Sequence, residues 1–139
     1  MRKERRFRIM ERIEAKTESG EVMAVLEIPS KIYIATPINA RSEKTFRDKY
    51  IAAKHRVNLL REIIRNDERF PKDIELVSSF DLNPLGKYTE SQAMGRCVAE
   101  VMDSDAIYLD HAWQSSNGCN LEYRTAKIYG KKIYEHDNL

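Results

Sequence analysis

One segment of the sequence combines a glycine, several hydroxyl and amide side chains and a carboxylate within ten residues. Residues 113 to 122 read Trp-Gln-Ser-Ser-Asn-Gly-Cys-Asn-Leu-Glu. If Glu122 enters the start of a helix, the partial positive charge of the helix terminus favours its ionised form. An ionised carboxylate can attack an anomeric carbon, the centre of an oxocarbenium-like transition state. A surface or capping role for Glu122 is the alternative at the same position.

Three neighbouring residues indicate how a ligand would contact this segment. Gly118 has no side chain and therefore allows a ligand to approach the backbone closely. Ser116 and the N–H groups of the loop could hold an anion such as a 5′-phosphate. Trp113 could stack on a base, and packing over the loop fits its position equally well.

The other nucleophilic and metal-ligating residues form no recognisable motif. Cys97 and Cys119 are too far apart for a CxxC pattern, and His55, His111 and His136 are scattered. No histidine partner is indicated for Cys119, so we do not expect it to be a nucleophile. His111 is either an acid near the site or a solvated side chain. We expect a reduced, cytoplasmic protein that needs no metal and no organic cofactor.

The elements that would position these residues alternate between strand and helix. Short apolar runs predict strands at 32–35, 74–77, 106–109 and 132–134. Apolar periodicity, with a capping box at Thr89 and Gln92, predicts helices at about 42–66, 89–102 and 121–129. This order is typical of a three-layer, flavodoxin-like or Rossmann-like α/β fold, in which helices cover both faces of a parallel sheet. Ligands of such sheets bind beyond the carboxyl ends of the strands, which selects the loops at 36–41, 80–88 and 110–120.

Residues 1–30 form an extension that precedes the predicted α/β domain at 31–139. Segments at 7–13 and 22–28 flank a Ser-Gly turn signal and indicate a β-hairpin, although Phe7, Met10 and Ile13 also fit a helical spacing. Basic residues crowd the first dozen positions and could contact phosphates or an acidic membrane surface, or remain a solvated terminus. The net charge of +2 makes nucleic acid an unlikely partner, and no apolar run approaches the roughly 20 residues needed to span a membrane.

Two motifs resemble the nucleoside 2-deoxyribosyltransferase-like superfamily. Residues 31–37, KIYIATP, are similar to its opening segment. Residues 105–109, followed by Trp113 and by the spacing Ser116-x-Gly118-x-x-x-Glu122, resemble its second signature. The likeness is greatest to an uncharacterised bacterial and phage branch with a W-x-x-S-x-G-x-x-x-E segment. Two linked motifs in a matching strand–loop–helix context are more specific than either motif alone.

The resemblance implies a role for each matching residue. Glu122 falls on the nucleophile that forms a glycosyl-enzyme intermediate, and Tyr33, at the end of the first strand, on the tyrosine that orients it. Gly118 falls on the loop glycine. Ser116 occupies a position where transferases of free nucleosides usually carry Asp and deoxynucleoside 5′-monophosphate N-glycosidases carry a phosphate-binding Ser. A hydroxyl can donate to a phosphate that a carboxylate would repel.

Further contacts are expected from the first loop and from the entrance of the third strand. Asn39 and Arg41 would contact the substrate, and Ser42 either meets a phosphate or caps the following helix. Asp105 is a candidate substrate contact, although ordering of the strand entrance is the more common role at such a position. Cys97 stands where the superfamily usually has an Asp that acts on the base or sugar.

The resemblance therefore implies cleavage of the N-glycosidic bond of a nucleotide or deoxynucleotide, with water as the acceptor and a homodimer as the assembly. The first alternative is base exchange between nucleosides, as in the deoxyribosyltransferases. The second is a nucleotide-binding or sensing module that has lost turnover, because Cys97 replaces an acid group. Weak nucleic-acid binding through the basic N-terminus is a third possibility.

Overall fold

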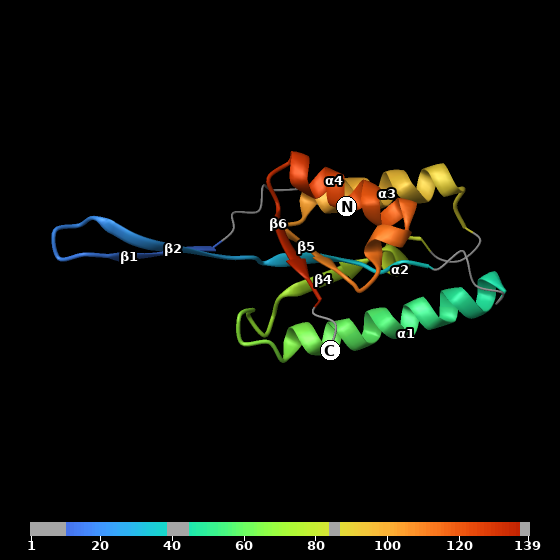
Figure 1. Ribbon diagram of the computed structural model, residues 1–139, viewed down its shortest axis with the longest axis horizontal. Helices are drawn as coiled ribbons and strands as arrows, with labels where there is room; N and C mark the ends of the chain where they lie inside the picture. The colour runs from blue at the N-terminus through green and yellow to red at the C-terminus, as the bar shows by residue number, and fades with distance from the viewer. Residues whose placement is uncertain (1–10, 39–44, 84–86, 137–139) are drawn as a thin grey trace, which may run out of the picture.

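The computed structural model describes residues 11–38, 45–83 and 87–136 of the chain. Its body is a four-stranded sheet in the order β4-β3-β5-β6, in which every neighbouring pair is parallel. The strands are β3 (Lys31–Ala35), β4 (Glu75–Ser78), β5 (Ala106–Leu109) and β6 (Lys132–Glu135). The predicted parallel α/β sheet is confirmed (Figure 1).

Helices cover both faces of this sheet, as Figure 1 shows. One face carries α1 (Phe46–Arg65), and the other carries α3 (Glu90–Asp103) and α4 (Asn117–Ile128). Strand residues alternate between the two layers, because Ile32 and Ile34 pack with α1, whereas Tyr33 and Ala35 pack with α3 and α4. The three layers are those expected from the sequence.

Helix α1 begins later than its sequence pattern indicates. Thr45 is its N-cap, because the Thr45 hydroxyl accepts a hydrogen bond from the backbone N–H of Asp48 at 3.3 Å. The predicted start at residue 42, with Ser42 as cap, is therefore wrong, and Ser42 itself lies outside the described residues. The apolar stripe is confirmed for Ala53, Val57, Leu60 and Ile64, which are buried, whereas Phe46 is 60% exposed.

The capping box before α3 is confirmed. The Gln92 N–H donates to the Thr89 hydroxyl, and the Thr89 N–H donates to the Gln92 side chain, at 3.3 and 3.0 Å. The preceding segment, expected as a loop, begins with a short helix, α2 (Ser79–Leu82). Its first turn forms because the Asp81 carboxylate accepts the Ser78 N–H at 2.8 Å. Residues 84–86 of the expected loop lie outside the described residues.

Helix α4 begins four residues before its predicted start. Ser116 is its N-cap, and a turn of 3₁₀ helix, η1 (Trp113–Ser115), precedes it, so the polar loop expected here is largely helical. The helix is followed by Gly130, whose φ of 66° is the left-handed conformation that commonly closes a helix. Glu122 consequently lies in the second turn of α4, and the first turn contains no acidic residue.

The N-terminal extension contains the predicted β-hairpin. Strand β1 (Glu11–Lys16) pairs antiparallel with β2 (Val22–Ile28), and Gly20 adopts a φ of 90° in the turn. The first strand runs to Lys16 rather than ending at Ile13, and the strand pairing of Ile13 rules out the helical alternative there. Residues 7–10 and most of the basic cluster lie outside the described residues.

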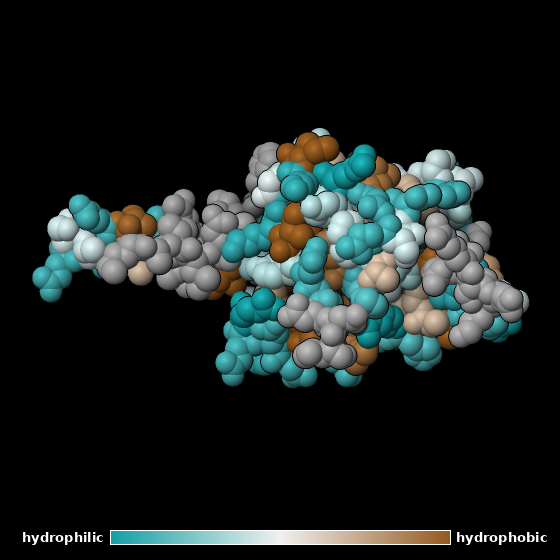
Figure 2. Space-filling view, viewed as in Figure 1, coloured by the Kyte–Doolittle hydropathy of each residue, from teal (hydrophilic) through white to brown (hydrophobic). Residues whose placement is uncertain are grey.

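The hairpin extends away from the α/β body, as both Figure 1 and Figure 2 show. It leads into the amino end of β3, so it projects from the side of the body opposite the carboxyl ends of the strands. No helix in the described part of the chain is both long and apolar enough to cross a membrane.

Candidate functional site

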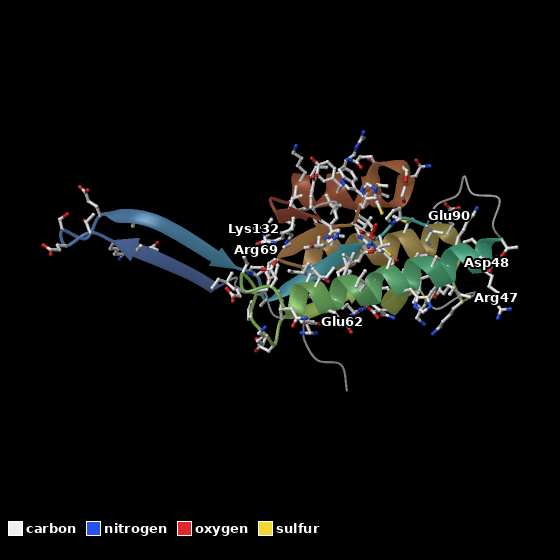
Figure 3. All side chains as sticks on the ribbon, turned by 60° about the horizontal axis from the view of Figure 1, so that its bottom comes forward. Arg47, Asp48, Glu62, Arg69, Glu90 and Lys132 are labelled. Atoms are coloured by element: carbon white, nitrogen blue, oxygen red, sulfur yellow. The ribbon has the colours of Figure 1, made fainter. Side chains whose placement is uncertain are left out.

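The strand order places a topological switch point between β3 and β5. The chain passes from β3 to β4 on one side and then returns to β5 on the other, so the loops after β3 and β5 diverge. Ligands of open α/β sheets bind beyond the carboxyl ends of the strands at such a point. Arg47, Asp48 and Glu90 mark this end of the body in Figure 3, because α1 and α3 begin there, whereas Arg69 and Lys132 mark the opposite end.

The side chain of Glu122 is buried in the layer formed by α3 and α4. It is only 5% exposed, and this burial raises its pKa from 4.5 to about 7, partly opposed by the Tyr33 hydroxyl. The sequence argument that a helix terminus keeps Glu122 ionised is therefore wrong, since Glu122 lies beyond the first turn of α4. Near neutral pH the carboxyl group is poised between its protonated and ionised forms.

Tyr33 faces Glu122 from the sheet. It is fully buried in the middle of β3, rather than at the end of the strand as expected. Burial and the neighbouring Glu122 and Cys97 raise the pKa of Tyr33 well above 10, so the phenol stays protonated and can donate a hydrogen bond. Among the described residues, neither the Tyr33 hydroxyl nor Oε2 of Glu122 has a partner in hydrogen-bond geometry. Buried polar atoms of this kind are uncommon, and they indicate a place where a ligand or water completes the site.

Two buried thiols adjoin this pair. Cys97 on α3 contributes to the raised pKa of Tyr33, and its own pKa is raised by burial and, to a smaller extent, by the charge of Glu122. The pKa of Cys119 is raised to about 12, mainly by burial and to a smaller extent by the charge of Glu122. Both thiols are therefore protonated at neutral pH, which agrees with the expectation that Cys119 is no nucleophile. Cys97 therefore places a protonated thiol next to Tyr33 and Glu122.

Ser116 and Gly118 form the start of α4. The Ser116 hydroxyl accepts the backbone N–H of Cys119 at 3.2 Å, and its hydrogen remains able to donate to a second group. A Cβ on Gly118 would make ordinary van der Waals contact with the Met94 side chain at 3.4 Å, so the packing of α3 on α4 does not itself require a glycine.

Trp113 packs inside the protein. It is 9% exposed, belongs to the core beneath α3 and α4, and its ring centre lies 4.6 Å from that of Tyr123. The structure thus shows the packing role for Trp113, whereas the stacking role stays a prediction.

Asp105 is not part of this site. One of its carboxylate oxygens accepts the N–H and hydroxyl of Ser30, both at 2.8 Å, and the Lys31 N–H at 3.1 Å. These bonds join the amino ends of β3 and β5, at the opposite end of the sheet from the switch point. The predicted substrate contact by Asp105 is corrected to a structural role. Asn39 and Arg41 lie outside the described residues.

Four polar residues near the carboxyl ends of the strands were not singled out from the sequence, although Thr36, Asn83 and Asp110 lie in the three loops that it selected. Asp110, directly after β5, is 2% exposed and binds the Arg56 guanidinium of α1. Oγ1 of Thr36, directly after β3, and Oδ1 of Asn83, after α2, are buried without a partner among the described residues. A polar residue immediately after a buried strand was the available signal for Thr36 and Asp110.

The backbone after β5 also adopts an uncommon conformation. Ala112 has a φ of 60°, the left-handed region that an alanine rarely enters. Such a conformation costs about 1–2 kcal/mol and persists only where the surroundings enforce it. Here it turns the chain between Asp110 and Trp113 at the switch point.

Fold and site together define a Rossmann-like α/β domain with a buried carboxyl group beneath the carboxyl edge of its sheet. The chain belongs to the family described as a domain of unknown function, DUF4406, whose model matches residues 30–135. The matched segment begins where the hairpin ends. Comparisons with curated proteins and with solved structures found no match.

Proposed function

We propose that this protein cleaves the N-glycosidic bond of a nucleoside 5′-monophosphate, with Glu122 as the nucleophile. The observation that carries the proposal is the buried pair formed by the Glu122 carboxyl and the Tyr33 hydroxyl beside the switch point. Each group has a polar atom without a partner in the described structure. The resemblance of residues 31–37 and 113–122 to the nucleoside 2-deoxyribosyltransferase-like superfamily supplies the substrate class.

The reaction requires two displacements at the anomeric carbon. In the first, a carboxylate oxygen of Glu122 bonds to the anomeric carbon, and the C–N bond breaks with its electron pair on the base, which takes up a proton. In the second, water attacks the same carbon and releases the sugar phosphate, its oxygen losing a proton as the Glu122 carboxylate is restored. Tyr33 would orient the carboxylate by a hydrogen bond once the substrate has excluded water.

The test is incubation of the protein with a panel of ribo- and deoxyribonucleoside 5′-monophosphates, followed by detection of free base. Release of base with water alone supports a hydrolase. Base that appears only in a new nucleoside, and only when an acceptor base is added, supports the transferase. Glu122→Ala should abolish either activity while the far-ultraviolet circular dichroism stays unchanged. Full activity in that variant would remove Glu122 from the mechanism.

Cys97 favours a second candidate, a nucleotide-binding module without turnover. It lies beside Tyr33 and Glu122 where the superfamily usually has Asp, and its protonated thiol is a poor acid for the departing base. Loss of an acid–base group lowers a rate by about 10²–10⁴-fold. Nucleotide binding by calorimetry without release of base would support this candidate. Cys97→Asp should then increase the rate of base release if only the acid group is missing.

A further inference from the structure

An arginine and an aspartate meet at the switch point on the face opposite Glu122. Both carboxylate oxygens of Asp110 accept the Nε–H of Arg56, at 2.9 and 3.0 Å, and one also accepts the His111 N–H at 2.7 Å. The Asp110 side chain is 3% exposed and that of Arg56 is 34% exposed. The aspartate therefore holds the guanidinium from inside the protein while part of the arginine remains open to solvent.

The register of the strands places Thr36 next to this pair. Ala35 and Leu109 are the last paired residues of β3 and β5, and the Asp110 N–H donates to the Ala35 carbonyl at 2.9 Å. Thr36 and Asp110, one residue further on, are therefore neighbours across the two strands. Oγ1 of Thr36 is buried and has no hydrogen-bond partner among the described residues. The Thr36 hydroxyl thus belongs to the residue next to the aspartate that holds the Arg56 guanidinium, where the loops of the parallel sheet diverge.

Arg56 differs from the next arginine of α1 in how its terminal nitrogens are used. Arg61 donates from both terminal nitrogens, one to the Leu76 carbonyl and the other to Ser78 and Asp81. Arg56 donates to Asp110 through Nε alone, and within the described ranges Nη1 and Nη2 have no hydrogen-bond partner. These two nitrogens can donate side by side to two oxygens of a phosphate or carboxylate.

We propose that Arg56, positioned by Asp110, binds the 5′-phosphate of the substrate, with the Thr36 hydroxyl as a second donor. This inference rests on the proposed function for the identity of the substrate. It places the phosphate contact at Arg56 of α1 instead of at Ser116, because the Ser116 hydroxyl already caps α4. A nucleotide at the carboxyl edge would then be held between Arg56 of α1 and Glu122 of α4, two helices on opposite faces of the sheet.

The experiment compares the affinity of one nucleoside 5′-monophosphate with that of its parent nucleoside by calorimetry. The wild type should bind the nucleotide more tightly by about ten- to a hundredfold, the range of a charge-assisted contact. Arg56→Gln should remove most of that preference and leave the nucleoside affinity unchanged. Arg61→Gln, on the same helix, is the matched control and should keep the preference.

Arg56→Gln leaves Asp110 buried without its cation and can destabilise the fold. The double variant Arg56→Gln with Asp110→Asn removes both charges and should fold, while losing the same preference. Ser116→Asp is the competing test, because Asp also caps a helix well but repels a phosphate. If Ser116→Asp loses the preference and the Arg56 variants keep it, the phosphate lies at the start of α4 and the inference is wrong.

A third measurement separates this inference from the proposed function. Inorganic phosphate should raise the melting temperature of the wild type and of Arg61→Gln, but not that of the Arg56 variants. If the wild type releases base and the Arg56 variants keep the nucleotide preference, only the inference fails. If no nucleotide loses its base but phosphate still stabilises through Arg56, the proposed function fails and the anion site stands. Equal losses for nucleotide and nucleoside would show a purely structural ion pair and overturn the inference.

Discussion

The titration of Glu122 links the chemistry of the site to the stability of the protein. Its pKa is about 7 in the folded protein and near 4.5 when exposed, so between these values only the folded state holds the proton. Stability then falls as pH rises through this window, by up to about 1.4 kcal/mol per pH unit and about 3 kcal/mol in all. Glu122→Gln cannot ionise and should lose this slope in urea unfolding at pH 5 to 8. Glu62→Gln, at an exposed position on α1, is the control and should keep the pH dependence of the wild type. If the free energy of unfolding changes with pH in the same way in the wild type and in Glu122→Gln, burial does not raise the pKa of Glu122.

The same carboxyl group predicts the pH dependence of turnover. A nucleophile must be ionised, and burial holds the pKa of Glu122 at about 7, so the rate of base release should rise with pH through about 7 rather than 4.5. Tyr33→Phe removes the hydroxyl that lowers this pKa and should move the rising limb to higher pH. Rates measured from pH 5 to 9 with saturating nucleotide would show the shift. If the rate of the wild type instead rises through about pH 4.5, Glu122 is solvated in the active protein.

At the scale of single elements, Asp105 ties together the amino ends of two strands. Its side chain accepts three hydrogen bonds from Ser30 and Lys31, two of them from backbone N–H groups. Asp105→Ala leaves these donors without their acceptor and should lower the free energy of unfolding by about 2–4 kcal/mol. Asp73→Ala, at an exposed position, should change it by less than about 0.5 kcal/mol in the same urea titration. Nucleotide affinity should survive in Asp105→Ala under conditions where it is folded, and a selective loss of affinity would return Asp105 to the site.

The elements also show which features a sequence can predict and why others escape it. Strand β5 and the start of α3 match their predictions because a short apolar run and a capping box are local signals. The starts of α1 and α4 do not, because several hydroxyl and amide residues precede each helix and any of them can cap it. Because α4 begins at Asn117, Glu122 lies in its second turn and not in its first. Burial, and not the helix terminus, therefore determines the pKa of Glu122.

Local sequence motifs predict some residues of the candidate site, but they do not predict contacts between residues far apart in the chain. The sequence motifs bring together Glu122 and Tyr33, and the structure places Tyr33 of β3 against Glu122 of α4. The pairing of Arg56 with Asp110 joins residues 54 positions apart on different elements, and no local pattern reveals it. Trp113 and Asp105 carry side chains suited to binding, and only their burial and partners show that the structure uses them otherwise.

At the scale of the whole molecule, the hairpin and the α/β body should be separable. The family match covers 30–135 and excludes both hairpin strands, which pair with each other and project from the body (Figure 1). A chain that begins at Pro29 keeps the buried proline and the Ser30 contacts to Asp105. Its melting temperature should lie within about 4 °C of the full chain, a change of less than about 1 kcal/mol. A larger drop in calorimetry would show that the hairpin stabilises the body.

The last prediction concerns assembly, and it rests on where apolar side chains remain exposed. Leu121, Ile128 and Tyr129, on or directly after α4, are 46%, 79% and 55% exposed, and Ile133 on the neighbouring edge strand β6 is 36% exposed. Figure 2 shows apolar surface at the carboxyl-terminal end of α4. Adjacent exposed apolar residues of this kind commonly mark an interface, and homo-oligomers most often form as two-fold dimers.

We therefore expect a homodimer in light scattering at micromolar concentration. Ile128→Asp should shift the protein to the monomer, because a buried charge at a two-fold interface lacks a partner in both copies. Phe46→Asp, at a position that is 60% exposed on α1, is the matched control and should leave the dimer intact. Superfamily resemblance implies that the partner completes the site, so loss of the dimer should also lower nucleotide affinity. A monomeric wild type that releases base at full rate would show that one chain forms the whole site.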